Sequence, residues 1–122
     1  MDYYNQAFPH IERPFAWIDL DAIDKNIAYV NEACGSKGIR IATKSVRSIE
    51  LLHYLQKQLV NCTGFMTFTA SETLYLLEKG FDELLLGYPI YEQQPLYDIA
   101  YYIASGKKVT FMVDAIEQAI QQ

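Results

Sequence analysis

The chain has 122 residues, of which 51% are apolar, and a net charge of −5 with no basic stripe. This composition fits one folded domain over residues 1–122 and argues against nucleic-acid binding, because phosphate contacts need clustered Lys and Arg. Two cysteines are too few for a disulfide framework, and the polar N-terminus is unlike a signal peptide. No apolar stretch approaches membrane-spanning length. We therefore expect a cytoplasmic domain without a membrane segment.

The apolar pattern predicts strands that alternate with helices along the whole chain. Each predicted strand is a short, largely apolar run, and each is followed by a turn and by a stretch with helical character. The expected strands cover residues 14–20, 39–43, 64–68, 84–86 and 108–113. The expected helices follow Asp21, Ser48 and Thr69, cover about 93–105, and begin again at Asp114.

Two of these helices carry recognisable start signals. Asp21 precedes a run of helical apolar spacing and is expected to cap the first helix. Thr69 and Glu72 are three residues apart and fit a capping box, in which each side chain satisfies a free backbone N–H near the other.

Strands that alternate with helices of this length predict an α/β fold with parallel pairing, because each helix must cross back over the sheet. The strands read as nearly continuous apolar runs, which predicts that helices bury both faces of the sheet. Four to five βα units in a row fit part of a (β/α) barrel or a doubly wound sheet. A complete eight-unit barrel needs about 250 residues, so we expect an incomplete one.

Lys44 is the strongest candidate for chemistry. It stands at the end of the predicted strand 39–43, before a polar turn, and side chains at that end of a parallel strand project into the crevice where α/β proteins bind ligands. A lysine amine there can form a Schiff base with a carbonyl compound once a neighbouring cation or burial favours its neutral form. Arg47 can supply such a charge. The alternative is that Lys44 is an ordinary solvated lysine at a strand end.

Four phrases of the chain resemble, in their order and spacing, the front part of alanine-racemase-like enzymes and of the related D-threonine aldolases and D-serine dehydratases. The phrases are PFAWIDLDAIDKNI (14–27), RIATKS (40–45), GFMTFTASE (64–72) and LLLGYP (84–89). The resemblance covers most of this chain but only the beginning of the family's length. It implies a pyridoxal 5'-phosphate (PLP) enzyme of fold type III, with a TIM-type barrel.

Several expectations follow from this resemblance. Lys44 would bind PLP as a Schiff base, Arg47, Thr67 and Tyr88 would contact the cofactor, and the strand at 14–20 would join a second, C-terminal β-domain. The activity would be that of a racemase (an isomerase), or of an aldolase or dehydratase (lyases), on a small amino acid, as in D-amino-acid metabolism. Ser48 stands where the racemases carry a phosphate-binding tyrosine, which favours the aldolase and dehydratase branch. We expect this portion alone to be inactive.

Other interpretations of the same residues stay open. Arg47 can be a surface charge, Thr69 a helix cap, and Tyr88 a packing residue beside Pro89. Asp19 and Asp21 could suggest a metal site or an acid–base pair, but two aspartates at a strand end and a cap position usually serve helix capping. His10 and His53 do not cluster with Cys or acidic residues, so we expect no metal. The chain can instead be a non-catalytic PLP-binding or truncated barrel fragment that self-associates into a homo-oligomer through exposed sheet edges, or a small doubly wound domain that binds another anion.

Overall fold

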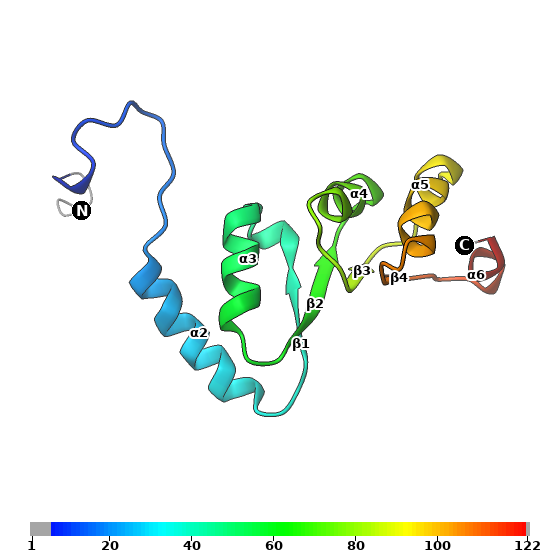
Figure 1. Cartoon of the computed structure of the whole chain (residues 1–122), viewed down its shortest axis with the longest axis horizontal. Helices are drawn as coiled ribbons and strands as arrows, with labels where there is room; N and C mark the ends of the chain where they lie inside the picture. Colours follow the sequence, from blue (N-terminus) through cyan, green and yellow to red (C-terminus); the bar gives the residue numbers. More distant parts are fainter. Residues whose placement is uncertain (1–5, 122) are drawn as a thin grey trace.

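The computed structural model describes residues 6–121, and its elements alternate between helix and strand (Figure 1). The helices are α2 (Leu20–Cys34), α3 (Ile49–Gln58), α4 (Ala70–Glu78), α5 (Gln93–Ala104) and α6 (Ile116–Gln121). The strands are β1 (Ile39–Ala42), β2 (Cys62–Thr67), β3 (Leu84–Leu86) and β4 (Val109–Phe111), and a short 3-10 helix (Thr43–Ser45) follows β1. No helix within the described range combines the length and the apolar character needed to cross a membrane.

The four strands form one parallel sheet in the order β1-β2-β3-β4, which confirms the predicted parallel α/β architecture. One row of paired residues crosses the whole sheet: Ile41 lies beside Phe65, Phe65 beside Leu84, and Leu84 beside Val109. The first three side chains are buried and the fourth is half-buried. This row therefore anchors the core.

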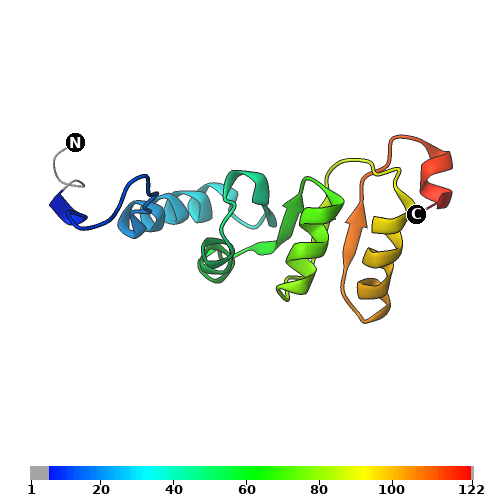
Figure 2. The same ribbon diagram turned by 90° about the horizontal axis from the view of Figure 1, so that it is seen from above.

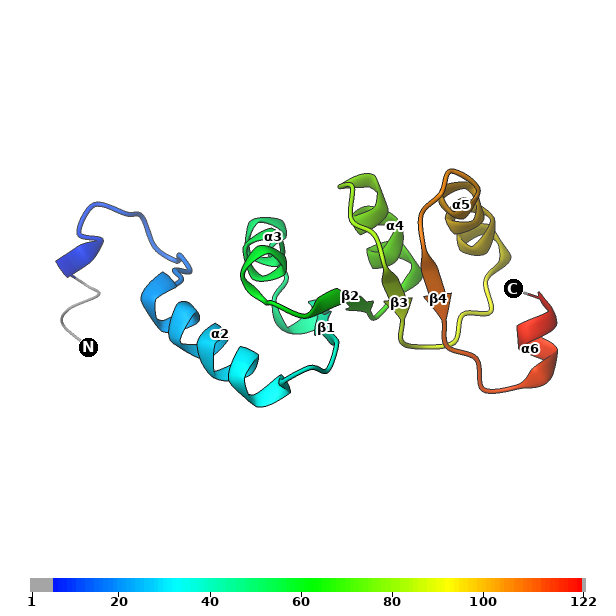
Figure 3. The same cartoon turned by 60° about the horizontal axis from the view of Figure 1, so that its bottom comes forward.

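Helices cover one face of this sheet. Figure 3 shows α3, α4 and α5 side by side along that face. A sequential strand order with right-handed crossovers places every connecting helix on the same side. On that side the core includes the buried Leu52, Leu76, Leu77, Phe81 and Ile99.

The opposite face carries no helix among the described residues. Arg40 and Thr110 are exposed there, and Ala42, Met66 and Leu85 are only half-buried. The prediction that helices bury both faces is therefore wrong for this part of the chain. A sequence shows that a strand residue is apolar but not what covers it, so it does not separate a helix-covered face from this open one. The inside of a barrel needs the same residues.

The segment before α2 also differs from the prediction. The backbone is extended at Asp19, but residues 14–19 form no strand, and Figures 1 and 2 show the chain ahead of α2 running away from the sheet. A strand exists only when a neighbouring strand pairs with it, and the sheet of the described residues consists of β1 to β4 without this segment. Helix α2 begins at Leu20, so its cap is Asp19, whose Oδ1 accepts a hydrogen bond from Ala22 N at 3.1 Å, and not Asp21.

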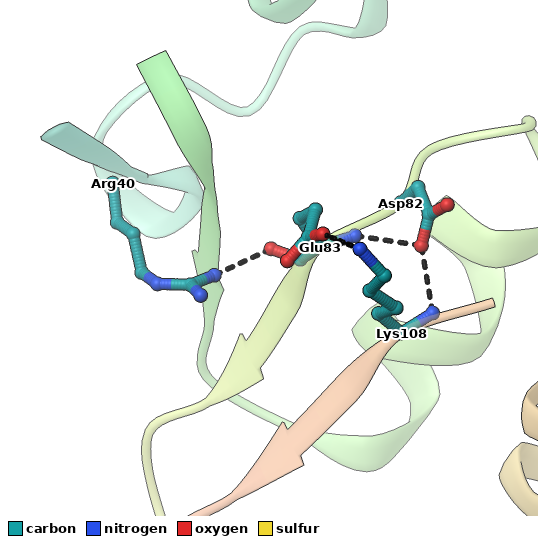
Figure 4. Close-up of polar contacts among 4 residues, drawn as sticks. All are labelled: Arg40, Asp82, Glu83 and Lys108. Atoms are coloured by element: carbon teal, nitrogen blue, oxygen red, sulfur yellow. Dashed lines mark hydrogen bonds and ion pairs between the residues drawn. The ribbon is translucent and has the colours of Figure 1, made fainter. Parts of the chain in front are cut away.

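A polar cluster fastens the sheet at the amino ends of its strands (Figure 4). Arg40 on β1 reaches across β2 at Gly64, and its Nη1 donates a hydrogen bond to the Glu83 carbonyl oxygen at 2.6 Å. Asp82 Oδ1 accepts from the backbone N–H groups of Glu83 (2.8 Å) and Lys108 (2.7 Å). The Lys108 ammonium lies 2.7 Å from Glu83 Oε1. These bonds link β1 to the residues that precede β3 and β4, at the end of the sheet opposite the carboxyl ends of its strands.

Candidate functional site

Lys44 lies at the carboxyl end of β1, within the 3-10 helix that links this strand to α3. The carbonyl oxygen of Thr43 accepts hydrogen bonds from Val46 N and Arg47 N, both at 3.0 Å, so a tight turn carries the lysine. Ser48 caps α3, because its hydroxyl oxygen accepts a hydrogen bond from Leu51 N. The structure therefore places the Lys44 amine at the sheet edge where parallel α/β proteins bind ligands.

One aromatic ring lies beside the amine, and a second ring contacts the first. Lys44 Nζ lies 5.5 Å from the centroid of the Phe68 ring, within the range of a cation–π contact. Phe68 follows β2 directly and meets Tyr88 edge to face, with ring centroids 4.6 Å apart. Both rings are 45% exposed, and together with Ala42 and Met66 they line a small hollow at the end of the strands. The structure thus brings Lys44 and Tyr88 into one site, with Phe68 between them.

A larger groove of about 570 Å³ opens on the other side of Lys44. It lies where α3 and α4 begin, and its volume is within the range of small-molecule sites. Its polar lining includes Lys44, Arg47, Ser48, Thr69 and Glu72. The positive ends of the α3 and α4 dipoles and two cationic side chains therefore meet two carboxylates, those of Glu50 and Glu72, at this groove.

Arg47 has an unusual backbone for a residue other than glycine, with φ at 50°. This left-handed conformation costs about 1–2 kcal/mol and lets the chain reverse from the 3-10 helix into α3. The Nε atom donates a hydrogen bond to the Lys44 carbonyl oxygen at 3.1 Å. Arg47 therefore lines the groove and also restrains the turn that carries Lys44.

Thr67 has a different environment from the one predicted. Its side chain is 1% exposed, and its hydroxyl shares a hydrogen bond of 2.6 Å with the Thr73 hydroxyl of α4. Thr67 contributes to the wall of the small hollow, but its oxygen faces the helix layer. A contact from this hydroxyl to a ligand would require the buried pair to break.

Glu72 is the site residue whose position the sequence did not predict. Thr69 caps α4 as expected, and its hydroxyl accepts a hydrogen bond from Glu72 N at 3.1 Å. The carboxylate does not complete the expected box with Thr69. Its Oε2 accepts from Phe68 N at 2.7 Å, and its Oε1 accepts from the Thr43 hydroxyl at 2.7 Å. Glu72 therefore connects the ends of β1 and β2.

Glu50 adds a second carboxylate to the groove, in the first turn of α3. Its pKa is lowered from the ordinary value because backbone N–H donation favours the charged form, and a hydrogen bond from the Ser48 hydroxyl at 3.0 Å adds to this. The groove therefore holds fixed negative charge at its α3 rim as well as the positive charges of Lys44 and Arg47. Over the described residues, no group of three His, Cys, Asp or Glu is arranged to hold a metal ion.

Compared with known proteins, the chain matches no protein-family model, and no curated protein shows significant similarity to it. Its chemistry must therefore be argued from the site. The site offers a primary amine, two aromatic rings, an arginine, two carboxylates and two helix N-termini around an open groove.

Proposed function

We propose that this chain is the cofactor-binding half of a PLP-dependent enzyme of the alanine racemase and D-threonine aldolase type. In this proposal, Lys44 holds the cofactor covalently. The observation that carries the proposal is the position of the Lys44 amine: it stands at the carboxyl end of the first strand of a parallel sheet, beside the Phe68 ring and at a groove that Arg47 also lines.

The residues present fit the parts of PLP. The amine of Lys44 suits the aldehyde, the rings of Phe68 and Tyr88 suit the flat pyridine ring, and Arg47 suits the phosphate. Thr67 serves this site by supporting β2 and the α4 contact through its buried hydroxyl.

Lys44 would bond through its nitrogen to the aldehyde carbon, and the carbonyl oxygen would leave as water. Bound PLP supplies an electron sink for a carbanion next to the substrate amine. With a small amino acid bound, the Lys44 amine would be the group that accepts or returns its α-proton. Racemisation and dehydration would need removal of the α-proton, and aldol cleavage would break the Cα–Cβ bond instead; the proposed role of Lys44 is compatible with each of these reactions.

The sheet geometry supports a barrel over a doubly wound sheet. A doubly wound sheet needs a point at which the strand order reverses and helices change faces. The order β1-β2-β3-β4 runs without reversal, and α3, α4 and α5 share one face (Figure 3). We propose that these four βα units form about half of an eight-stranded barrel.

The sheet edges motivate a second proposal, that the chain associates with another copy of itself. Within the described residues β1 pairs only with β2, and β4 pairs only with β3, so each outer strand presents unpaired backbone groups. Parallel pairing of β4 with β1 of a second copy would join two four-stranded sheets. Size-exclusion chromatography with light scattering should give a dimer. A 14.0 kDa monomer at high concentration would contradict this second proposal.

Absorbance titration with PLP tests the main proposal. The parent chain should change the cofactor's visible spectrum, and Lys44→Ala should remove that change. Lys79 provides a matched control, since its Nζ also lies over a ring, 5.3 Å from the centroid of Tyr75, but it does not line the groove. Lys79→Ala should bind as the parent does. A Lys44→Ala chain that responds like the parent would overturn the proposal.

A further inference from the structure

We propose that Glu72 is a positioning residue that sets the place of the Lys44 amine by holding the ends of two strands together; this inference rests on the proposed function of Lys44. Glu72 touches neither the amine nor the hollow beside Phe68 and Tyr88. It acts through Thr43, which precedes the lysine in the chain, and through Phe68, whose ring lies beside the lysine nitrogen.

The first link runs from Glu72 to the turn that carries the lysine. Thr43 is 1% exposed, and its hydroxyl lies within hydrogen-bond distance of two acceptors, Glu72 Oε1 at 2.7 Å and the Met66 carbonyl oxygen at 3.0 Å. A hydroxyl has one hydrogen to donate, and a hydrogen bond to a carboxylate is stronger than one to a neutral carbonyl. The contact with Glu72 is therefore the stronger of the two.

The second link runs from Glu72 to the aromatic pair. Glu72 Oε2 accepts a hydrogen bond of 2.7 Å from the backbone N–H of Phe68. This bond fixes the backbone at the point where β2 has ended and before α4 begins, and so fixes the direction in which the Phe68 ring leaves the chain. Tyr88, which lies two residues after the end of β3, supports the same ring by its edge-to-face contact.

Hydrogen-bond requirements separate two neutral replacements of Glu72. In Glu72→Gln the amide oxygen can accept from Phe68 N, while the amide NH₂ donates to the Thr43 oxygen and the Thr43 hydrogen goes to Met66 O. Glu72→Met has nearly the same volume and the same charge as Glu72→Gln but accepts no such bonds. Both variants keep the Thr69 cap, because that bond uses the backbone N–H of residue 72.

The test reads the position of the lysine directly. All lysines of the full chain are dimethylated with ¹³C-formaldehyde and a mild reductant, and the Lys44 methyl signal is identified by its loss in Lys44→Arg. The Phe68 ring should shift this signal upfield of the other lysines, and Phe68→Leu should remove the shift. We expect Glu72→Gln to keep the shift and Glu72→Met to lose it.

Two further variants guard against a loss of stability being mistaken for a loss of position. Thr73→Val removes the hydroxyl that pairs with Thr67 and so loosens α4 without touching Thr43 or Phe68; it should keep the upfield shift. Thr43→Val breaks the same link from the other end with an isosteric side chain, and it should lose the shift even if Glu72→Met fails to fold. The inference is overturned if the Lys44 methyl signal keeps its upfield shift in Thr43→Val, or if it loses that shift in Glu72→Gln.

The rate at which PLP labels Lys44 separates this inference from the proposed function. Glu72→Met should slow labelling about fivefold, the factor that one hydrogen bond contributes, and Glu72→Gln should not. If the parent shows the upfield shift but PLP does not label Lys44, the proposed function fails and the positioning role stands. If PLP labels Lys44 equally fast in the parent and in Glu72→Met, the positioning role fails.

Discussion

Replacing Gly64 by alanine should weaken the whole sheet. Gly64 lies in β2 with φ at 137°, a backbone conformation that residues with a Cβ rarely adopt. An alanine Cβ there would overlap the Glu83 carbonyl oxygen and lie 2.8 Å from Arg40 Nη1. The same carbonyl accepts the hydrogen bonds from Arg40 Nη1 at 2.6 Å and from Phe65 N at 3.1 Å, so β2 and β3 cannot separate without losing both.

These effects set the magnitude of the destabilisation. Backbone strain of this kind costs about 1–3 kcal/mol, and each of the two hydrogen bonds contributes about 1 kcal/mol. We expect Gly64→Ala to lower the free energy of unfolding by about 3–5 kcal/mol. Since domains of this size are stable by roughly 5–15 kcal/mol, the variant should lie close to its unfolding midpoint in mild denaturant.

Urea unfolding followed by far-UV circular dichroism measures this loss. Gly80 is a matched control, because its φ is also positive, at 89°, while an added Cβ meets no atom within 4 Å. Gly80→Ala should therefore cost only the strain of about 1–2 kcal/mol. If Gly64→Ala costs no more than Gly80→Ala, the close approach of Glu83 and Arg40 to β2 is not what holds the strands together.

Three further predictions concern single groups. The hydrogen bond from Lys108 N lowers the pKa of the Asp82 carboxyl below its ordinary value of 3.8. The ionised carboxylate therefore stabilises the fold above pH 3.8, and this stabilisation is lost as the pH falls through the lower pKa of the folded state. Asp82→Asn should flatten the pH dependence of the urea midpoint in this acidic range, and an unchanged slope would refute the prediction. The hydrogen bond to Asp24 raises the pKa of Tyr54 above 10.0, so Asp24→Asn should lower it in a ¹³C NMR titration of the phenol, whereas an unmoved midpoint would exclude the bond. Because Arg47 has a positive φ, Arg47→Gly should be more stable than Arg47→Ala by about 1 kcal/mol in urea, and equal stabilities would contradict the left-handed turn.

Local signals predicted most of the fold. Short apolar runs bounded by glycine and polar turns located β1, β2 and β3 to within two residues at each end, and the threonine before α4 predicted its cap. These features could be read from the sequence because they depend on neighbours within about four residues. The placement of Lys44 at a strand end belongs to the same class, since it needs only the end of an apolar run and the polar turn after it.

The remaining features depend on contacts between distant residues. Residues 14–20 have the composition of a strand but form none, because pairing is a property of two segments. Val109–Phe111 is shorter than the predicted strand 108–113 for a related reason, since it pairs only as far as β3 extends. The capping box could not reveal that Glu72 bonds to Thr43, which lies 29 residues away in the sequence.

Trapping with borohydride tests most directly whether Lys44 is a PLP lysine. The chain is mixed with PLP at low molar excess, reduced, digested and analysed by mass spectrometry, so that each of its lysines competes for the same label. The account predicts that the peptide containing Lys44 carries most of the pyridoxyl group and that prior saturation of the amine by dimethylation prevents this. Label spread evenly over the exposed lysines, with no preference for Lys44, would contradict it.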